Sequence, residues 1–381
     1  MMGANRYGEQ GSLMKHPSLY LDWYVHMPKV KYDLRSSGQG TFKYDVNLGE
    51  VDLAVNHAHG NPETVSLLAR RYGVESENVF TSSEGTSGQN VRIARVLAEK
   101  NPEKNEAVVE FPTYEPLLRQ VQEYFPIVKR LKREEAEGYG LDASRLRNVV
   151  SEKTGLLVLT NPHLPTGAVS PLSELEEVMS VAQEHDFYVM CDEIYAEFKR
   201  KGIPTVFSLD NRLGVVTTGF SKAYGLGGLK MGVGLASKEL VDELYADTLS
   251  TVGVFANIVE ILVAKLLSTR YDVMERRKEK YLDLKNNAEK LLDEKGFQYV
   301  TGNSCLTFWI KLQVKDTYKW INQHAIQRYS WAAVPGAFFL FENDRNLAES
   351  NIVRLGVGGL DPDEPRLAEA FDIFEKALRT A

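Results

Sequence analysis

The chain has 381 residues, of which 43% are hydrophobic and 25% are charged, an ordinary globular composition with enough length for two domains. Its 45 basic and 52 acidic residues give a net charge of −7, which offers no broad attraction for nucleic acid or for an anionic membrane surface. Neither is expected as a partner.

The start of the chain and its cysteines bear on its location. Residues Met1 to Ser12 are polar and Gly-rich and lack the apolar stretch of a signal peptide, and no run of about 18 apolar residues occurs anywhere. Cys191 and Cys305 each lie in a short apolar run, as buried free thiols do in a reducing compartment. We therefore expect a cytoplasmic protein.

Predicted elements begin with an aromatic-rich segment, Met14 to Tyr32, which has no β/α rhythm and which we assign to an arm or to a smaller domain. From Ala107 onward, short continuous apolar runs recur, a pattern typical of strands buried on both faces. These runs cover residues 107–111, 156–160, 187–192, 215–220 and 231–236. Residues 173–185 have helical spacing, and Ser173 with Glu176 forms a capping-box pattern. Strand, helix, strand predicts a mostly parallel α/β sheet.

The stretch from about Tyr271 to Lys295 is densely charged, with apolar side chains at helical spacing. It predicts a long helix that connects to a smaller C-terminal domain. We expect an arm and part of the small domain in residues 1–44, a large domain in 45–270 and a small α+β domain in 271–381.

Several common catalytic motifs are missing from the sequence. There is no G-x-x-x-x-G-K-[ST], no H-E-x-x-H, no G-x-S-x-G, and no G-x-G-x-x-G after a strand. The pentad Gly219 to Ala223 comes near the hydrolase motif but has alanine in place of the second glycine, so Ser221 is not expected to be a nucleophile. No metal site is expected either.

Polar residues do follow several predicted strands, at the edge where open parallel sheets bind ligands. Lys222 comes after the strand at 215–220 and before Gly225, Gly227 and Gly228, so little side-chain bulk surrounds it. A partly desolvated lysine of this kind can form a Schiff base with an aldehyde. Taken alone, the pattern fits a solvated surface lysine more often.

Two further positions can likewise be explained either by a cofactor site or by ordinary structure. Asp192, with Tyr195 three residues later, follows a buried strand, where a carboxylate needs a partner; a protonated pyridine nitrogen and a helix N-terminus are equally good candidates. Gly85 and Thr86 precede a helix and could bind phosphate at its positive end. Taken alone, a plain capped helix start is the more common explanation of that pattern.

In chain order these pieces resemble the class I/II aminotransferases, enzymes of pyridoxal-phosphate (PLP) fold type I. The family has a Gly-Thr turn, a stacking aromatic, N-P-x-N-P-T-G, D-x-x-Y, S-K-x-x-G-L-x-G-x-R-x-G and a late arginine. This chain has Gly85-Thr86, Tyr114 in Phe-Pro-Thr-Tyr, Asn161-Pro-His-Leu-Pro-Thr-Gly167, Asp192 with Tyr195, Ser221-Lys222 through Gly232, and Arg354 in Ile-Val-Arg-Leu. The resemblance spans residues 85 to 354.

The resemblance implies a role for each of these positions. Lys222 would form the Schiff base with PLP and move the substrate proton, Asp192 would pair with the pyridine nitrogen, and Arg354 would bind the substrate α-carboxylate. The other cofactor contacts would be Gly85, Thr86, Ser221 and Lys230 at the phosphate, Tyr114 on the ring face, and Tyr195 and Asn161 at the phenolic oxygen.

The sequence departs from the family pattern at three positions. Leu164 replaces the usual asparagine that bonds the phenolic oxygen, which leaves that contact to Asn161 or to none. Lys230 replaces a phosphate-binding arginine and keeps the charge without the planar fork. Gly219 replaces a hydroxyl residue, so Thr218 or Ser221 would serve the phosphate.

The implied activity is a ping-pong transamination between an amino acid and a 2-oxo acid, with aspartate or glutamate as the donor by family analogy. A homodimer with the site at its interface is implied as well. Two alternatives stay open: another fold type I PLP reaction, namely decarboxylation or β-elimination, and a non-catalytic protein that keeps the fold for ligand binding.

Overall fold

The computed structural model describes residues 17–201, 203–343, 346–363 and 366–381. The polar stretch Met1 to Ser12 and the first residues of the aromatic-rich segment lie outside these ranges. Within them, no helix combines the length and the apolar character that a bilayer crossing requires. Cys191 and Cys305 are buried and unpaired, as predicted.

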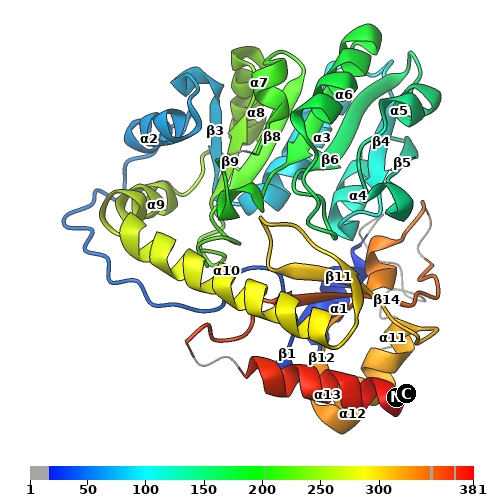
Figure 1. The fold of residues 1–381 in the computed structure, drawn as a ribbon. Coiled ribbons are helices and arrows are strands. Elements are labelled where there is room, and N and C mark those ends of the chain that lie inside the picture. Colours follow the sequence, from blue (N-terminus) through cyan, green and yellow to red (C-terminus); the bar gives the residue numbers. More distant parts are fainter. Residues whose placement is uncertain (1–16, 202, 344–345, 364–365) are drawn as a thin grey trace.

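A seven-stranded sheet forms the larger part of the molecule, in the order β3-β9-β8-β7-β6-β4-β5 (Figure 1). Its strands are β3 (Val79–Ser82), β4 (Glu106–Phe111), β5 (Ile127–Lys132), β6 (Thr154–Thr160), β7 (Tyr188–Asp192), β8 (Gly214–Gly219) and β9 (Gly232–Leu235). Strands β4 to β8 are parallel, and β9 runs antiparallel to both of its neighbours. All five predicted strands are confirmed, and most of their residues are apolar and buried because helices cover the sheet on both faces.

Three groups of helices surround this sheet. Helix α3 (Gly85–Lys100) contacts β6, β8 and β9 and packs beside α4 (Glu115–Gln122) and α8 (Lys238–Thr251). Helix α6 (Leu172–His185) packs against both α5 (Ala143–Val149) and α7 (Val206–Leu209), and α2 (Pro62–Tyr72) packs against α9 (Asn257–Thr269). The capping box predicted for α6 is wrong: Pro171 is the N-cap and no side chain caps this end, so Ser173 falls inside the first turn.

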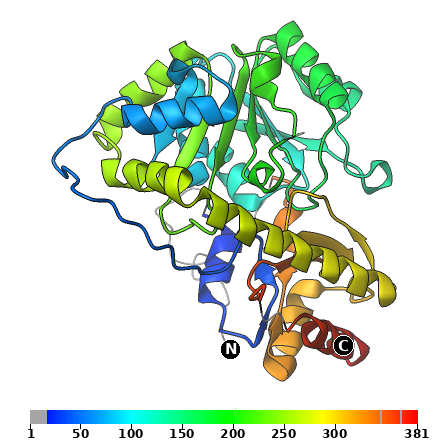
Figure 2. The same ribbon diagram turned by 60° about the vertical axis from the view of Figure 1, so that its left-hand side comes forward.

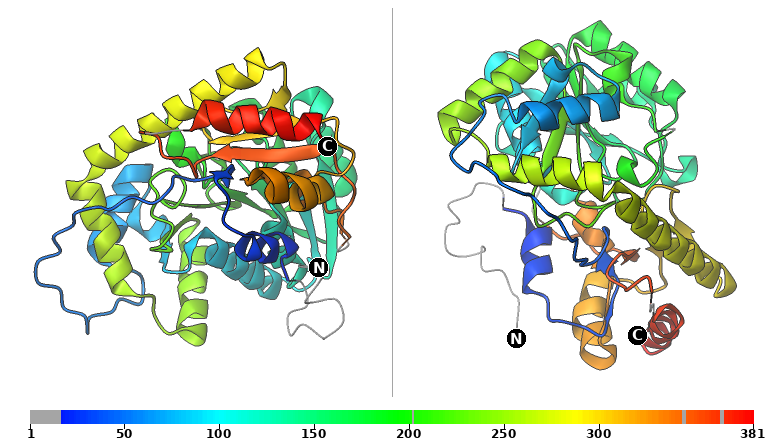
Figure 3. Two further views of the ribbon diagram at one scale, coloured as in Figure 1. Left: turned by 90° about the horizontal axis from the view of Figure 1, so that it is seen from below. Right: turned by 90° about the vertical axis from the view of Figure 1, so that its left-hand side faces the viewer.

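The second sheet draws on both ends of the chain. Its strands are β10 (Gln298–Val300), β11 (Thr307–Lys311), β14 (Ile352–Val357) and β13 (Val334–Pro335), with β2 (Arg35–Ser36) parallel to β14. Nearby, β1 (Tyr32–Asp33) pairs with β12 (Trp331–Ala332). Helices α11 (Thr317–Trp320), α12 (Ile326–Tyr329) and α13 (Leu367–Arg379) accompany these strands, and Figure 3 shows them from below.

The long helix predicted near residue 271 is confirmed as α10 (Tyr271–Glu294), which runs from the large sheet toward the small one (Figure 1). The N-terminal segment holds a short helix that the sequence pattern did not predict, α1 (Leu19–His26). Between β2 and α2 the chain forms no helix or strand and passes along the outside of the molecule (Figure 2). The residues just after β2 reach Lys222.

Candidate active site

Strand register brings several of the predicted site residues to one edge of the large sheet. Asp192, the last residue of β7, is aligned with Thr160 at the end of β6 and with Thr217 near the end of β8. Lys222 follows β8 after a two-residue gap, and Asn161 follows β6 directly. Because parallel strands end at a common edge, residues far apart in sequence become neighbours here.

Asp192 is a buried carboxylate, with 5% of the residue exposed. Its Oδ2 accepts a hydrogen bond from Asn90 Nδ2 at 2.9 Å, and its Oδ1 accepts one from the backbone N–H of Ile194 at 3.0 Å. Burial raises the pKa of Asp192, whereas these two hydrogen bonds and the charge of Lys222 act in the opposite direction. Asp192 can therefore accept a further cationic donor.

Lys222 lies within electrostatic reach of Asp192. The pKa of Lys222 is lowered to about 8, first by burial and next by the positive charge of Arg354. Its Nζ donates to Ser37 Oγ at 3.2 Å. The chain after β2 passes so close that a Cβ built on Gly38 would lie 2.9 Å from Lys222 Cδ, so only glycine fits at that position.

Arg354 is a buried guanidinium on β14, with 3% of the residue exposed. Its Nη2 donates to the carbonyl of Arg35 and lies 3.5 Å from Tyr20 OH, and both of these partners are neutral. The other buried arginines of the described chain, Arg35, Arg92, Arg119 and Arg133, each form an ion pair with a carboxylate. Among the described residues Arg354 has no such partner, although a buried cation needs one.

Tyrosines fill the space between these charges. Burial raises the pKa of Tyr114, and Tyr20, Tyr195, Asp192 and Arg354 all act on it electrostatically. The Tyr114 ring meets the Tyr20 ring edge-on, with 5.6 Å between centroids. Burial also raises the pKa of Tyr195, while Ser37 acts on it in the opposite direction. Both hydroxyls therefore stay protonated at neutral pH and can donate.

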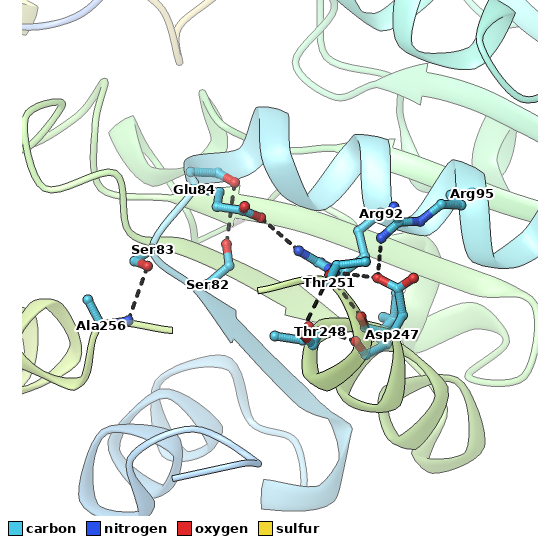
Figure 4. A network of polar contacts seen from close by, with 11 residues as sticks. Ser82, Ser83, Glu84, Arg92, Arg95, Asp247, Thr248, Thr251 and Ala256 are labelled. Carbon is cyan, nitrogen blue, oxygen red and sulfur yellow. Dashed lines mark hydrogen bonds and ion pairs between the residues drawn. The ribbon is translucent and has the colours of Figure 1, made fainter. Parts of the chain in front are cut away.

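The start of α3 offers free backbone donors beside these residues. Gly85 is the first helical residue, and no side chain caps this end. Figure 4 shows how the helix is anchored: Glu84 bonds Arg92 at 3.0 Å, and Arg92 and Arg95 both reach Asp247 of α8. The anchoring charges are thus satisfied within the protein. The N–H of Gly85 is bonded to the carbonyl of Lys230, so in the first turn the N–H groups of Thr86 and Ser87 remain available to an anion.

Lys230 lies beside this helix start. Its carbonyl accepts the backbone N–H of Gly85 at 2.5 Å, and its backbone is left-handed, with φ of 53°. Its side chain is exposed, and its charge reaches Lys222. Ser221 is half-buried, whereas the Thr218 hydroxyl is buried and donates to the carbonyl of Glu193 at 3.2 Å. Ser221 is therefore the freer of the two hydroxyls.

The loop after β6 is held by hydrogen bonds from its own side chains. Asn161 donates to the carbonyl of Pro204 at 3.2 Å and accepts the N–H of Ser170 at 3.0 Å, so both ends of its amide are engaged. Leu164 is buried at 7% exposure and presents no polar atom from its side chain. The His163 ring bonds Thr166 and the carbonyl of Pro112, and burial lowers its pKa, so it stays neutral.

A family model described as aminotransferase class I and II matches residues 49–371. The chain belongs to this family. The fold type I architecture expected from the sequence is confirmed, and the cofactor of class I and II aminotransferases is the expected one, pyridoxal 5′-phosphate.

Individual relatives agree with the family assignment. Aromatic-amino-acid aminotransferase 2 of Thermococcus litoralis is 24% identical, with 92% of this chain and 87% of that protein covered. A histidinol-phosphate aminotransferase of Methanococcus maripaludis is 30% identical over 183 residues, 48% of each protein, so the match spans about half the length of that relative. A PLP-dependent aminotransferase from Streptococcus suis superposes with a TM-score of 0.80 at 21% identity, covering 96% of this chain and 99% of that one; this likeness concerns the fold.

The structure adds three residues to the predicted aminotransferase site. Ser37 contacts Lys222, Tyr20 contacts Arg354, and Asn90 contacts Asp192. The first two lie in the N-terminal segment, whose sequence pattern marks no function. Asn90 did leave a signal, because it is an uncharged polar residue among the buried apolar residues Ile93 and Ala94 of α3.

Proposed function

We propose that this protein is a PLP-dependent aminotransferase that moves an amino group between an amino acid and a 2-oxo acid in two half-reactions, with Lys222 as the covalent attachment point of the cofactor. One observation carries the proposal: the Lys222 amine is influenced at once by a buried carboxylate, Asp192, and by a buried guanidinium, Arg354, that lacks a carboxylate partner in the described chain. A substrate carboxylate would satisfy Arg354 through a charge-assisted hydrogen bond.

The residues at this edge fit the cofactor. The uncapped start of α3, with Gly85 and Thr86, suits the phosphate, and Lys230 and Ser221 lie on the segment beside it. Asp192 has acceptor capacity left for the ring nitrogen. When bound, PLP supplies an electron sink next to the substrate α-carbon, and the protein supplies binding, orientation and proton transfer.

Lys222 is suited to proton transfer by its lowered pKa. A pKa of about 8 leaves part of the amine neutral near neutral pH, whereas an ordinary lysine is almost fully protonated. The neutral Nζ can take a proton from the substrate α-carbon and return it later. Ser37 and Gly38 limit where Nζ can move, because they lie against the side chain.

The tyrosines and Asn161 complete the proposed contacts. Tyr195, protonated at neutral pH, would donate to the phenolic oxygen of the cofactor, and Tyr114 would stack on the ring. Asn161 keeps one amide hydrogen beyond its bond to Pro204, and Leu164 offers none. The hydrogen bond that the family asparagine supplies at position 164 thus rests on Asn161 alone.

For the amino donor we keep aspartate or glutamate in the proposal. A dicarboxylate needs a second cation, and we propose Arg35 for this role. The Arg35 carbonyl accepts a hydrogen bond from Arg354, and the Arg35 guanidinium lies 5.4 Å from the centre of the Tyr24 ring. Asp33 holds Arg35 through two bonds of 2.8 and 2.7 Å, so a distal carboxylate would share Arg35 with Asp33.

Assembly, domains and location are also part of the proposal. We propose a homodimer, because apolar side chains are exposed before α2 and between α8 and α9, among them Leu53 at 77% and Val252 at 51%. The boundaries at residues 44/45 and 270/271 agree with the strand content, since the large sheet uses only strands from 79–235. The two unpaired buried cysteines favour the cytoplasm.

The test combines cofactor attachment with a donor screen. We expect the purified protein to bind PLP with an absorption band that borohydride removes, and mass spectrometry to locate the reduced adduct on Lys222. Adding an amino acid without a 2-oxo acid should convert the cofactor to its amine form. Release of carbon dioxide or ammonia instead would identify a decarboxylase or a β-eliminating lyase, and bound PLP without any turnover would identify a binding protein. A protein that takes up no PLP refutes the proposal.

A further inference from the structure

A two-residue chain of hydrogen bonds supports the carboxylate at the site. Asn90 on α3 donates from Nδ2 to Asp192 Oδ2 at 2.9 Å, and the hydroxyl of Thr217 on β8 donates to Asn90 Oδ1 at 2.6 Å. Both supporting residues are buried, with exposures of 2% and 0%. Both the oxygen and the nitrogen of the buried Asn90 amide are hydrogen-bonded. Losing either bond would cost stability, because it would leave a buried polar atom without a partner.

The direction of this chain follows from the charge of Asp192. An ionised carboxylate can only accept, so the NH₂ group of Asn90 must face it. The amide oxygen then faces Thr217, whose hydroxyl must donate. A protonated Asp192 could itself donate a hydrogen bond, and the direction of donation from Thr217 through Asn90 to Asp192 would no longer be fixed. The arrangement therefore favours the ionised carboxylate in one orientation.

We propose that Asn90 is a positioning residue, which together with Thr217 holds Asp192 as an oriented carboxylate for the ring nitrogen of the cofactor. This inference rests on the proposed function. The carboxylate receives two bonds, from Asn90 and from the N–H of Ile194, out of about four that it can accept. Asn90 thus fixes Asp192 without using up the acceptor sites that a cationic ring nitrogen needs.

The position of Asn90 on α3 links both ends of the proposed cofactor site. Asn90 comes four residues after Thr86, so the two side chains share one face of the helix. The first turn of α3 faces the proposed phosphate position, and the next turn supports Asp192. Because α3 is anchored to α8 through Arg92 and Asp247, both contacts belong to one rigid element.

The main test compares two isosteric changes on neighbouring residues of α3. Gln89 is fully buried and donates to the carbonyl of Phe80 at 3.1 Å, so Gln89→Met removes one buried hydrogen bond that does not reach Asp192. Asn90→Leu also removes buried hydrogen bonds but releases Asp192. We expect the PLP dissociation constant to rise by about tenfold to a hundredfold in Asn90→Leu, because a hydrogen bond to a charged group is lost. In Gln89→Met the dissociation constant should stay within about threefold of that of the unchanged protein. Thr217→Val should raise it by a smaller factor.

A second variant keeps the inference testable if Asn90→Leu fails to fold. Asn90→Asp places two carboxylates side by side, which share a proton at low pH and repel each other at high pH. We expect its PLP affinity relative to the unchanged protein to be near normal at pH 5.5 and to fall by at least about tenfold by pH 8.5. If Asn90 has a purely structural role, the PLP affinity of Asn90→Asp relative to the unchanged protein should not depend on pH.

The outcomes separate the two proposals. If the unchanged protein binds no PLP, the proposed function fails. If it binds PLP, and both Asn90→Leu and Gln89→Met bind equally well while the Asn90→Asp ratio stays flat, the positioning role of Asn90 is refuted and the proposed function stands. Equilibrium dialysis with PLP measures every arm without requiring turnover, and thermal unfolding of the cofactor-free variants checks that they fold.

Discussion

Two groups of buried or half-buried charges lie near the carboxyl edge of the large sheet, and they are organised differently. The first, the Glu110 network, consists of Glu110, Arg133, Thr160 and Ser170. Arg133 donates to Glu110 at 2.8 Å, to Ser170 at 2.8 Å and to the carbonyl of Tyr139 at 2.6 Å, and both charged side chains are 1% exposed. Every nitrogen of this guanidinium has an acceptor within the protein.

The second group is the site cluster, Lys222, Arg354 and Asp192. Here two cations accompany one carboxylate, and the guanidinium of Arg354 bonds only neutral oxygens among the described residues. The comparison shows that burial by itself does not identify a functional charge, because the Glu110 network is buried more completely. What distinguishes the site cluster is its surplus of positive charge, which an anionic ligand would balance.

The largest expected effect comes from removing the lysine of the site cluster. In Lys222→Ala the amine that we propose to hold the cofactor and to move the proton is absent. Turnover should fall by at least about a hundredfold, the lower limit for a lost general acid–base group. Borohydride should leave no covalent adduct on the protein, and reversed-phase mass spectrometry of the reduced sample measures this. An adduct of unchanged yield on another lysine would show that Lys222 was assigned wrongly.

Arg133→Met and Arg354→Met test the difference between the Glu110 network and the site cluster through the free energy of unfolding. Arg133→Met leaves Glu110 buried without its cation, and we expect a loss of about 3–5 kcal/mol in the free energy of unfolding at pH 8. The loss should be smaller at pH 5.5, because burial already raises the pKa of Glu110 to about 7 and the carboxyl can protonate there.

Arg354→Met removes a cation that has no carboxylate partner, so it should change the free energy of unfolding of the cofactor-free chain by only about 1 kcal/mol. Urea unfolding of both variants without cofactor provides the measurement. Equal losses in the two variants would contradict the distinction between a closed network and an open site.

Substrate binding sharpens the same contrast. Arg354→Met should raise the KM for the amino donor by about tenfold to a hundredfold, since the carboxylate loses a charge-assisted bond. The KM of Arg354→Lys should lie between those of Arg354→Met and the unchanged protein, because lysine keeps the charge but lacks the planar pair of donors of the guanidinium. PLP affinity should stay near normal in both variants, and Arg133→Met should leave KM unchanged in the fraction that is folded. A normal KM in Arg354→Met would remove this residue from the substrate site.

Much of the large sheet could be predicted from sequence because its strands are local patterns. Runs such as those at 156–160 and 187–192 are almost entirely apolar, and their length of five or six residues is typical of strands and short for a helix. The order of the motifs along the chain then placed Lys222, Asp192 and Arg354 in one site. The error at α6 was also local: Ser173 and Glu176 fit the capping-box spacing, but Pro171 ends the preceding segment two residues earlier.

What could not be predicted depends on contacts between distant residues. At the start of helix α1, the N–H groups of Leu19 and Tyr20 donate to Glu115, which lies 95 positions from Tyr20 in the sequence. The local sequence therefore offered only Ser18 as a sign of a helix start. That remote carboxylate fixes α1 and brings Tyr20 to Arg354. Likewise Ser37 meets Lys222 across 185 positions. Spacing rules describe neighbours on one element and carry no information about such pairs.

The smallest predicted effect concerns the proton affinity of Lys222 in the cofactor-free chain. Its pKa of about 8 reflects burial first and the charge of Arg354 next, and both penalise the protonated amine. Modification of Lys222 by an amine reagent, followed peptide by peptide by mass spectrometry, should therefore show a midpoint near pH 8, well below the range of an ordinary lysine. In Arg354→Met one positive neighbour is gone, so the midpoint should move to higher pH. In Arg133→Met it should not move, because Arg133 does not act on this amine. A midpoint that moves equally in both variants, or lies near that of exposed lysines in the same digest, would mean that the surplus charge of the site cluster does not act on Lys222.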